Sequence, residues 1–376
     1  MHRWRSTAVA CAAAPVLVLA ACGTGDGDGG GNAPDGGELS GSLTGAGATF
    51  PTPVFQEWQQ AYGAEQPGVS INYQSIGSGG GIEQFLESTV DFGSSERYLD
   101  DVDLSEARQS RVDATGVEDC EPIQFPVLFG SVVIAFNDQD LDGMVLTAET
   151  IAKIFDREIT NYSDPELAEL NPDMDLPDQD IVPVHRSDGS GTTYVFTHYL
   201  SHEVDEWAEN YGEGTEVQWA SGTVGGQGNE GVSANINQNT GALGYVNQAY
   251  ALEAGMPQAQ VINADGEAVY PTLEATTEAS EEAEIPEGFQ FDIDDIGGTG
   301  YPIAGTNWIF TYECGYDETT GEILRDYWTW AVTSDEAREL ALELGYAPMG
   351  EELAERVTGE IERINSKAVD GAEVEN

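Results

Sequence analysis

The sequence predicts an α/β fold, because short apolar strands alternate with helical stretches from residue 42 onward. The length supports a larger architecture: 376 residues exceed what one ordinary core organises, so we expect two domains. The composition is that of a folded chain, since 40% apolar residues provide enough buried surface despite the high charge. No repeat of solenoid period is visible along the chain.

The first elements follow from the spacing of apolar residues. Apolar side chains recur at helical intervals over residues 54–62, and Val69, Ile71 and Tyr73 alternate with polar neighbours as on a half-buried strand. Residues 126–137 (PVLFGSVVIAFN) are a nearly continuous run rich in β-branched residues. Such a run is typical of a strand that is buried on both faces.

The later elements are predicted in the same way. Helices are expected over residues 147–155, 192–200, 337–344 and 351–364. The third of these follows Thr-Ser-Asp-Glu at residues 333–336, which has the pattern of a capping box. Residues 301–312 are expected to form a strand that returns between lobes, and the acidic stretch 274–287 a surface helix or excursion.

The first 21 residues have the features of a secretory signal peptide. Arg3 and Arg5 precede a run of small and apolar residues that ends in Leu-Ala-Ala-Cys at Cys22. This ending is similar to the lipobox of bacterial lipoproteins, and secretion with a free Cys22 is the alternative. Residues 22–41 are glycine-rich and predict a flexible tether. We therefore expect an extracytoplasmic protein that is anchored to the cell membrane as a lipoprotein.

Two cysteines, Cys120 and Cys314, lie within the part expected to fold. In an oxidising compartment they are a candidate disulfide. Two buried free thiols are the alternative.

The charge is strongly negative and spread over the whole chain. The formal net charge is −55, and Lys153 and Lys367 are the only lysines. Such a charge excludes nucleic acid as a natural partner. Because salt shortens the range of charge repulsion to about 3 Å at 1 M, we expect a halophilic protein that unfolds in dilute buffer.

Four segments rich in glycine and hydroxyl residues stand out, at residues 44–51, 77–81, 91–96 and 186–192. Three of them open expected helices, where free N–H groups attract anions. A single glycine cluster of this kind is usually only a tight turn. Arg186 adds a cation to the last segment of a chain in which cations are rare. Together these segments predict a pocket for an oxyanion.

Six segments resemble the phosphate-binding protein of the bacterial and archaeal phosphate ABC transporter. They are residues 45–53 (GAGATFPTP), 73–81 (YQSIGSGGG), 90–96 (VDFGSSE), 186–192 (RSDGSGT), 225–231 (GGQGNEG) and 241–246 (GALGYV). The resemblance implies a two-lobed periplasmic-binding-protein fold, similar to type II, with two crossovers and hinge closure on the ligand. The implied lobes are residues 42–130 and 296–376 for the first and 131–295 for the second.

The resemblance also implies the binding residues. They are Thr49, Phe50, Ser78, Glu96, Arg186, Ser190, Gly191 and Thr192, with Asp188 bracing the arginine. The chemistry is consistent, because phosphate oxygens bind arginine and oriented donors. The carboxylate of Glu96 can accept the O–H of phosphate, whereas sulfate at neutral pH carries no such proton.

The sequence departs from the family at Glu96, where aspartate is common. One additional methylene can move the acceptor by about 1.5 Å, given ordinary bond lengths. Either the loop compensates, or the protein discriminates less well against other oxyanions, including arsenate. Two alternatives are Asp91 as a substitute acceptor and Glu96 as a solvated surface acid.

Other functions fit the sequence less well. His198 and His202 have the spacing of two metal ligands, but no third ligand is suggested nearby, so we expect a surface pair. Ser190 lies in no Gly-x-Ser-x-Gly elbow, and neither the metal cluster nor the nucleophile–base pair of a phosphatase is evident. Glu96 opposes a sulfate receptor, and a purely structural lipoprotein leaves the four segments unexplained. We therefore expect a monomeric, non-enzymatic phosphate receptor without cofactor or metal, which delivers phosphate to a membrane permease.

Overall fold

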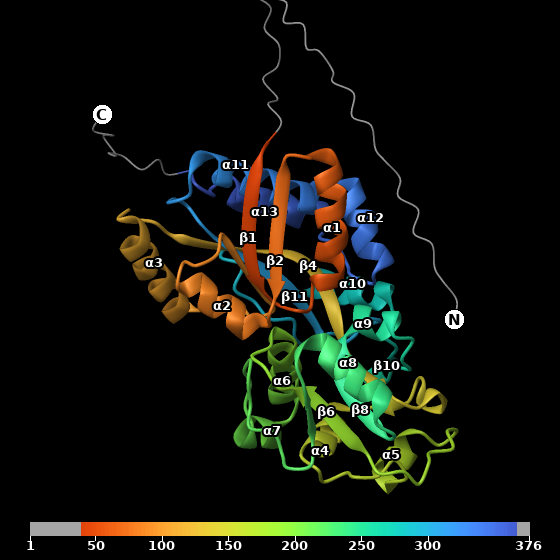
Figure 1. Cartoon of the computed structure of the whole chain (residues 1–376). Helices are drawn as coiled ribbons and strands as arrows, with labels where there is room; N and C mark the ends of the chain where they lie inside the picture. The colour runs from red at the N-terminus through yellow and green to blue at the C-terminus, as the bar shows by residue number, and fades with distance from the viewer. Residues whose placement is uncertain (1–38, 367–376) are drawn as a thin grey trace, which may run out of the picture. The chain divides into compact units, whose positions relative to one another are not determined.

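The computed structural model describes residues 39–366 (Figure 1). The expected signal peptide at residues 1–21, the lipid site at Cys22 and most of the tether at 22–41 lie outside the described residues. Within 39–366, no helix has both the length and the apolar character needed to cross a membrane.

One curled sheet of eight strands runs through the described part of the chain. Its order is β2 (Val69–Ser75), β1 (Gly41–Gly47), β3 (Phe92–Ser95), β11 (Ala304–Tyr312), β4 (Pro122–Phe136), β8 (Ala242–Asn247), β6 (Val182–Arg186) and β7 (Val224–Gly226). The pairs β1–β2 and β1–β3 are parallel, and so are β6–β7 and β6–β8. The central strands β3, β11, β4 and β8 pair antiparallel to one another.

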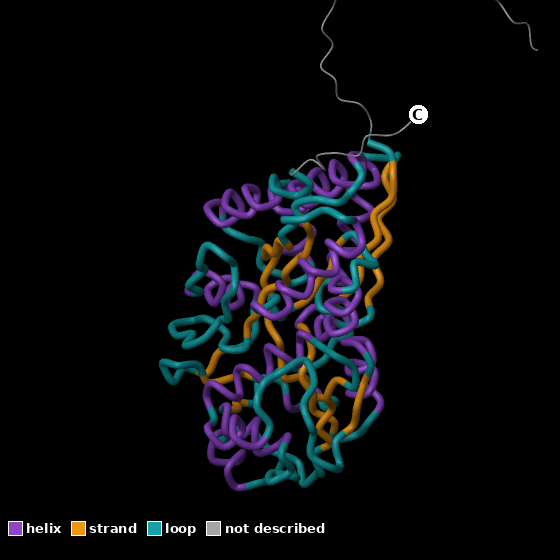
Figure 2. Tube along the Cα trace, turned by 90° about the vertical axis from the view of Figure 1, so that its left-hand side faces the viewer, coloured by secondary structure: helices purple, strands orange, loops and turns teal. Residues whose placement is uncertain are grey.

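The sheet divides into two lobes at β4. This strand pairs with β11 as far as Ser131 and with β8 from Val132 onward. We call the part built on β1, β2, β3 and β11 the first lobe, and the part built on β6, β7 and β8 the second lobe. Strands are present in both halves of the side view, with helices around them (Figure 2). The predicted α/β fold with two lobes is thereby confirmed.

The helices of the first lobe come from both ends of the described chain. They are α1 (Thr52–Glu65), α2 (Ser78–Leu86), α3 (Asp101–Thr115), α11 (Glu318–Thr333), α12 (Asp335–Glu343) and α13 (Glu351–Ile361). Trp328 of α11 is fully buried, and its ring meets those of Phe55, Phe92 and Phe125 edge-on. The N- and C-terminal parts of this lobe therefore share one aromatic core.

The chain between β4 and β11 supplies the second lobe. Its remaining elements are η1 (Gln139–Leu141), β5 (Val145–Leu146), α4 (Ala148–Phe155), α5 (Pro165–Leu170), α6 (Gly191–Glu203), α7 (Asp205–Asn210), α8 (Gly228–Gln238), α9 (Gln248–Glu253), β9 (Gln260–Ile262), β10 (Ala268–Val269) and α10 (Leu273–Glu282). The strands β10, β9 and β5 form a separate small sheet.

Two sequence predictions of helix ends need correction. The helix expected from residue 337 begins at Asp335, and its N-cap is Ser334, whose hydroxyl accepts from the N–H groups of Glu336 and Ala337. Thr333 instead is the last residue of α11, and its hydroxyl donates to the Thr329 carbonyl of that helix. The last helix, expected to reach residue 364, ends at Ile361.

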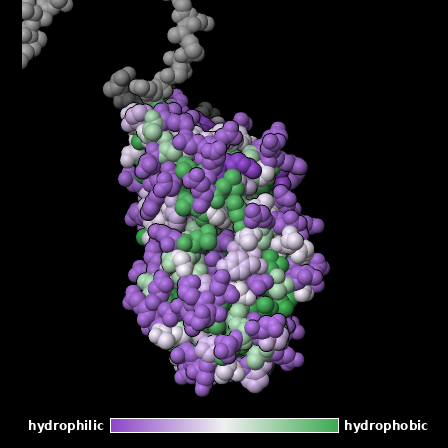
Figure 3. Space-filling model, turned by 90° about the vertical axis from the view of Figure 1, so that its right-hand side faces the viewer, coloured by the Kyte–Doolittle hydropathy of each residue, from purple (hydrophilic) through white to green (hydrophobic). Residues whose placement is uncertain are grey.

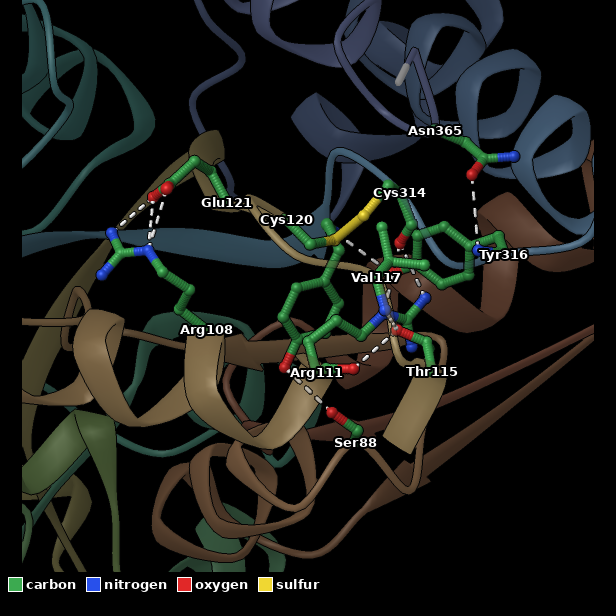
Figure 4. The surroundings of a disulfide bond; sticks show 11 residues. Ser88, Arg108, Arg111, Thr115, Val117, Cys120, Glu121, Cys314, Tyr316 and Asn365 are labelled. Carbon is green, nitrogen blue, oxygen red and sulfur yellow. Dashed lines mark hydrogen bonds and ion pairs between the residues drawn. A yellow bond between two sulfur atoms is a disulfide. The ribbon is translucent and has the colours of Figure 1, made fainter. Parts of the chain in front are cut away.

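A disulfide ties the outer ends of β4 and β11 together (Figure 4). Cys120 precedes β4 and Cys314 follows β11, and their Cα atoms are 5.6 Å apart. The guanidinium of Arg111 donates to the Cys314 carbonyl from Nη2 over 3.0 Å and lies over the rings of Tyr312 and Tyr316. The sequence left a disulfide and two free thiols as alternatives for these cysteines, and in the structure they form the disulfide.

The two lobes also meet at Asp292, in the segment between α10 and β11. Its carboxylate accepts from the hydroxyl of Tyr98 in the first lobe over 3.3 Å and from that of Tyr194 on α6 over 3.0 Å.

The surface on the side drawn in Figure 3 is mostly hydrophilic, with smaller areas of hydrophobic side chains. Such a surface is consistent with a net charge of −55.

Candidate functional site

The four glycine–hydroxyl segments converge at the carboxyl ends of parallel strands from both lobes. Within the first lobe, the Gly77 N–H donates to the Gly47 carbonyl over 2.9 Å. Between the lobes, the Gly79 N–H donates to the Gly189 carbonyl over 3.0 Å. The carboxyl edge of an α/β sheet is where such folds usually bind ligands.

Arg186 is the last residue of β6, and its side chain is only 1% exposed. Its Nε and Nη2 donate to the two carboxylate oxygens of Asp188 over 2.9 and 2.6 Å. Its backbone N–H donates to the Tyr245 hydroxyl over 3.0 Å. This bidentate pairing fixes the plane of the guanidinium and leaves Nη1 outside the pair.

Asp188 also connects the arginine to neighbouring backbone. The Gly228 N–H, at the start of α8, donates to the same carboxylate over 3.0 Å. Gly77 of the first lobe has φ +91°, and a Cβ on it would lie 2.6 Å from Oδ2 of Asp188. Glycine is therefore required at position 77 for the first lobe to approach the Arg186–Asp188 pair.

The start of α6 is buried beside this pair. Ser190 is the N-cap, and its hydroxyl accepts from the Thr193 N–H over 3.1 Å. Gly191 and Thr192 form the first turn, where backbone N–H groups have no partner inside the helix. A Cβ on Gly191 would lie 2.3 Å from Oε2 of Glu96, so only glycine lets that carboxylate approach the helix.

Glu96 directly follows β3 and is 1% exposed, so it is not a solvated surface acid. Its Oε2 accepts from the Ser78 hydroxyl over 3.2 Å, and its Oε1 from Nδ2 of Asn307 over 3.0 Å. Burial raises the pKa of this carboxyl, while the charge of Arg186 and the two hydrogen bonds lower it, with a net value of about 7. The group therefore changes its protonation in the neutral range.

Thr49 lies in the loop between β1 and α1. Its hydroxyl accepts from the backbone N–H of Asn229 over 3.1 Å and from its Nδ2 over 2.8 Å. The same Nδ2 also donates to the Thr192 hydroxyl over 3.1 Å. One buried asparagine on α8 thus contacts a threonine of each lobe.

Phe50 is fully buried. Its ring packs against Tyr346, with 5.9 Å between the ring centroids, and its carbonyl accepts from the Tyr346 hydroxyl over 2.5 Å. The side chain is therefore part of the core. Only the backbone of Phe50 is available to the site.

Asp91, the alternative acceptor, is occupied elsewhere. Its carboxylate accepts from both the N–H and the hydroxyl of Thr44, over 2.7 and 2.8 Å. Thr44 lies within β1, ahead of the loop that carries Thr49.

The histidine pair on α6 is surrounded by carboxylates that its spacing in the sequence did not suggest. His198 contacts Glu213 over 2.6 Å and Asp294 over 2.9 Å, and His202 contacts Asp295 over 3.1 Å. Burial opposes the charged form of His198, but its hydrogen bonds to the two acids outweigh burial and raise its pKa to about 10. These contacts are those of histidine–carboxylate ion pairs.

Two residues of the site were missed by the sequence analysis, Asn229 and Asn307. Asn229 lies in the segment 225–231, which was noted only for its resemblance. Asn307 is fully buried in the middle of β11. An amide side chain inside a strand predicted from residues 301–312 was the available signal, since a buried amide requires partners.

Comparisons with known proteins place the chain in a family. Residues 32–336 match the family model of the PBP superfamily domain. The chain is 38% identical over 320 residues to a phosphate-binding protein PstS of Xylella fastidiosa, covering 84% of this chain and 83% of that protein. It is 33% identical over 329 residues to a phosphate-binding protein PstS of Methanocaldococcus jannaschii, covering 82% of each.

Solved structures show the same fold. A high-affinity periplasmic phosphate-binding protein, PfluDING, bound with phosphate, is similar with a TM-score of 0.69 and 22% identity, over 85% of this chain and 93% of that one. An ABC-type phosphate transport receptor of Vibrio cholerae is similar with a TM-score of 0.51 and 22% identity, over 82% of this chain and 100% of that one. The family model and the sequence relatives show that this chain belongs to the phosphate-binding proteins of the PBP superfamily.

Proposed function

We propose that this chain captures inorganic phosphate outside the cytoplasm and delivers it, without turnover, to the permease of a phosphate ABC transporter. The observation that carries this proposal is the joint placement of Arg186, the start of α6 and Glu96 in one buried site. Arg186 and the helix N–H groups supply donors for phosphate oxygens. Glu96 supplies an acceptor for the phosphate proton.

We assign the ligand contacts as follows. Donors to phosphate are the hydroxyls of Thr49, Ser190 and Thr192, the backbone N–H groups of Phe50, Ser78, Gly191 and Thr192, and Nη1 of Arg186. The Ser78 hydroxyl itself donates to Glu96. Glu96 accepts the phosphate O–H, and Asp188 holds the arginine. These residues are buried, except for the half-buried Asp188, and hydrogen bonds through Asn229 join those of the two lobes.

The acceptor gives selectivity for phosphate over sulfate. Sulfate at neutral pH has no proton to donate, so an ionised Glu96 would face a sulfate oxygen without a hydrogen bond. A buried polar group left without a partner in this way accounts for large selectivity factors. The two hydrogen bonds from Ser78 and Asn307 hold the longer glutamate side chain in position, which supports compensation for the added methylene.

Ligand exchange requires the lobes to open. We propose residues 42–130 and 296–376 as the first lobe and 131–295 as the second, with the hinge in the crossing segments. The change of partner strand between Ser131 and Val132 in β4 supports the boundary at residues 130 and 131. The start of β11 at Ala304 supports a boundary at residues 295 and 296, where the chain returns to the first lobe.

We further propose that the mature chain is a halophilic, monomeric lipoprotein held by Cys22. The sequence from Leu19 to Cys22 and the glycine-rich segment behind it support this anchor. Mass spectrometry of the N-terminal peptide of the protein purified from membranes checks it: a diacylglycerol-modified Cys22 is expected, and an unmodified cysteine would contradict the anchor.

Equilibrium dialysis with labelled phosphate at molar salt tests the function itself. We expect one saturable phosphate site per chain and no release of phosphate from phosphate esters. Hydrolysis of such esters, or the absence of a saturable site, would contradict the proposal.

A further inference from the structure

The contacts of Asn229 determine in which direction two hydroxyl groups of the site donate. The Oδ1 of Asn229 accepts from the backbone N–H of Asn247 over 3.0 Å. A backbone N–H can only donate, so this contact fixes which end of the amide is the oxygen. The Nδ2 group must therefore be the end that contacts Thr49 and Thr192, over 2.8 and 3.1 Å.

The Thr49 hydroxyl has used its acceptor capacity. A hydroxyl has one proton to donate and two lone pairs to accept with. On Thr49 both lone pairs are taken, one by the backbone N–H and one by Nδ2 of Asn229. Its remaining hydrogen bond is therefore a donation, and the two donors of Asn229 make the Thr49 hydroxyl a fixed donor.

The Thr192 hydroxyl is oriented by the same amide. It accepts from Nδ2 of Asn229, so its proton points away from α8. Thr192 belongs to the second lobe and Thr49 to the first, and both are buried, with exposures of 0% and 3%. An amide with two protons can orient one hydroxyl of each lobe at the same time.

We propose that Asn229 is a positioning residue that makes the hydroxyls of Thr49 and Thr192 donate into the closed site, one from each lobe. This inference rests on the proposed function, because it assumes that the two threonines contact phosphate. The inference has two consequences. The ligand oxygens that face the Thr49 and Thr192 hydroxyls must accept hydrogen bonds from them. Asn229 also couples ligand affinity to closure of the lobes, because it contacts a threonine of each lobe. Asn229 touches no ligand atom in this scheme.

The test is a thermodynamic cycle measured by calorimetric titration with inorganic phosphate at molar salt. Asn229→Ala should weaken phosphate binding about 10- to 100-fold, which corresponds to two lost orienting hydrogen bonds. In a chain that carries Thr49→Val and Thr192→Val, Asn229→Ala should change the affinity by less than about threefold. A purely structural role for Asn229 would instead give the same loss in both backgrounds and overturn the proposal.

A second variant covers the case that Asn229→Ala does not fold. Asn229→Asp has the same shape but presents an acceptor in place of Nδ2, which turns the threonine hydroxyls away from the ligand. Its loss should exceed that of Asn237→Asp, a matched control that adds the same charge at an exposed position of the same helix. Equal effects of the two aspartates would overturn the inference.

The outcomes separate this inference from the proposed function. If the unmodified chain binds no phosphate, the proposed function fails and the inference fails with it. If the unmodified chain binds phosphate and Asn229→Ala binds it equally well, only the inference fails.

Discussion

Asn307 donates from Nδ2 to Oε1 of Glu96 over 3.0 Å, from the centre of strand β11 to the end of strand β3. The Oδ1 of the same amide accepts from the Ser94 hydroxyl over 3.0 Å, which is consistent with this orientation of the amide. Glu96 is thus an acid held in a fixed direction inside the site. Its pKa of about 7 makes its charge, and with it the proposed selectivity, sensitive to pH.

Replacing Glu96 by glutamine should remove the selectivity for phosphate over sulfate. The amide of Glu96→Gln can donate to a sulfate oxygen, so the ratio of phosphate to sulfate affinity should fall by at least about tenfold. Competition titrations at pH 8 measure this ratio. Glu57→Gln, at an exposed position of α1, is the control and should leave the ratio unchanged.

The same carboxyl should make the selectivity of the unmodified chain depend on pH. Below pH 7 Glu96 becomes protonated and can donate to sulfate, so sulfate should compete better at pH 5.5 than at pH 8. The folded-state pKa of about 7 lies above the ordinary 4.5, so the stability contributed by protonated Glu96 is complete below pH 4.5 and is lost as pH rises from there to about 7. Glu96→Gln should therefore gain thermal stability relative to the ligand-free unmodified chain as pH rises. A stability difference that is independent of pH would contradict this.

His198 should stabilise the fold in its charged form. Its folded-state pKa of about 10 lies above the ordinary 6.5, so its contribution is complete below pH 6.5 and is lost as pH rises towards 10. His198→Gln should therefore destabilise most at pH 6 and little near pH 10, as measured by denaturant unfolding. His202→Gln should have a smaller effect, because its pair with Asp295 is more exposed. Equal losses at both pH values would speak against the ion pairs.

Removing the disulfide should destabilise the chain without affecting the site. Replacing Cys120 and Cys314 by serine opens a loop of 194 residues and should lower the unfolding free energy by about 2–5 kcal/mol. Denaturant unfolding checks this. A reductant should lower the unfolding free energy of the unmodified chain but not that of the variant. Recovery of two free thiols by alkylation of the native protein would refute the bond.

The acidic surface should make stability depend on salt. With a net charge of −55, mutual repulsion opposes folding in dilute buffer and is screened at molar salt. The thermal midpoint should therefore rise markedly between 0.1 M and about 3 M potassium chloride. An unchanged midpoint would contradict the proposed halophilic character.

The sequence predicted those elements whose signal is local. The alternation at Val69, Ile71 and Tyr73 marked β2, and the apolar run at 126–137 marked most of β4. The start of α12 was misplaced because α11 continues to Thr333 and leaves Ser334 to cap the next helix. Two adjacent hydroxyl residues compete for such a cap, and tertiary packing decides between them.

The site was predictable where its residues are neighbours in the chain. Arg186, Asp188 and the start of α6 lie within one short segment with a visible glycine–hydroxyl pattern. The partners Asn307 and Glu96 are 211 residues apart. A hydrogen bond over that separation depends on the sheet order, which places β11 beside β3, and no local pattern reports it.

Calorimetric titration of phosphate at molar salt, on the unmodified chain and on Arg186→Ala, tests the central claim most directly. The unmodified chain should bind phosphate at one saturable site, and Arg186→Ala should lose at least about 100-fold in affinity, because a buried charged donor is removed. Arg157→Ala, which removes an arginine of the second lobe that donates to the Ile181 carbonyl, is the control and should bind phosphate normally. No phosphate binding by the unmodified chain, or equal binding by Arg186→Ala, would contradict the account.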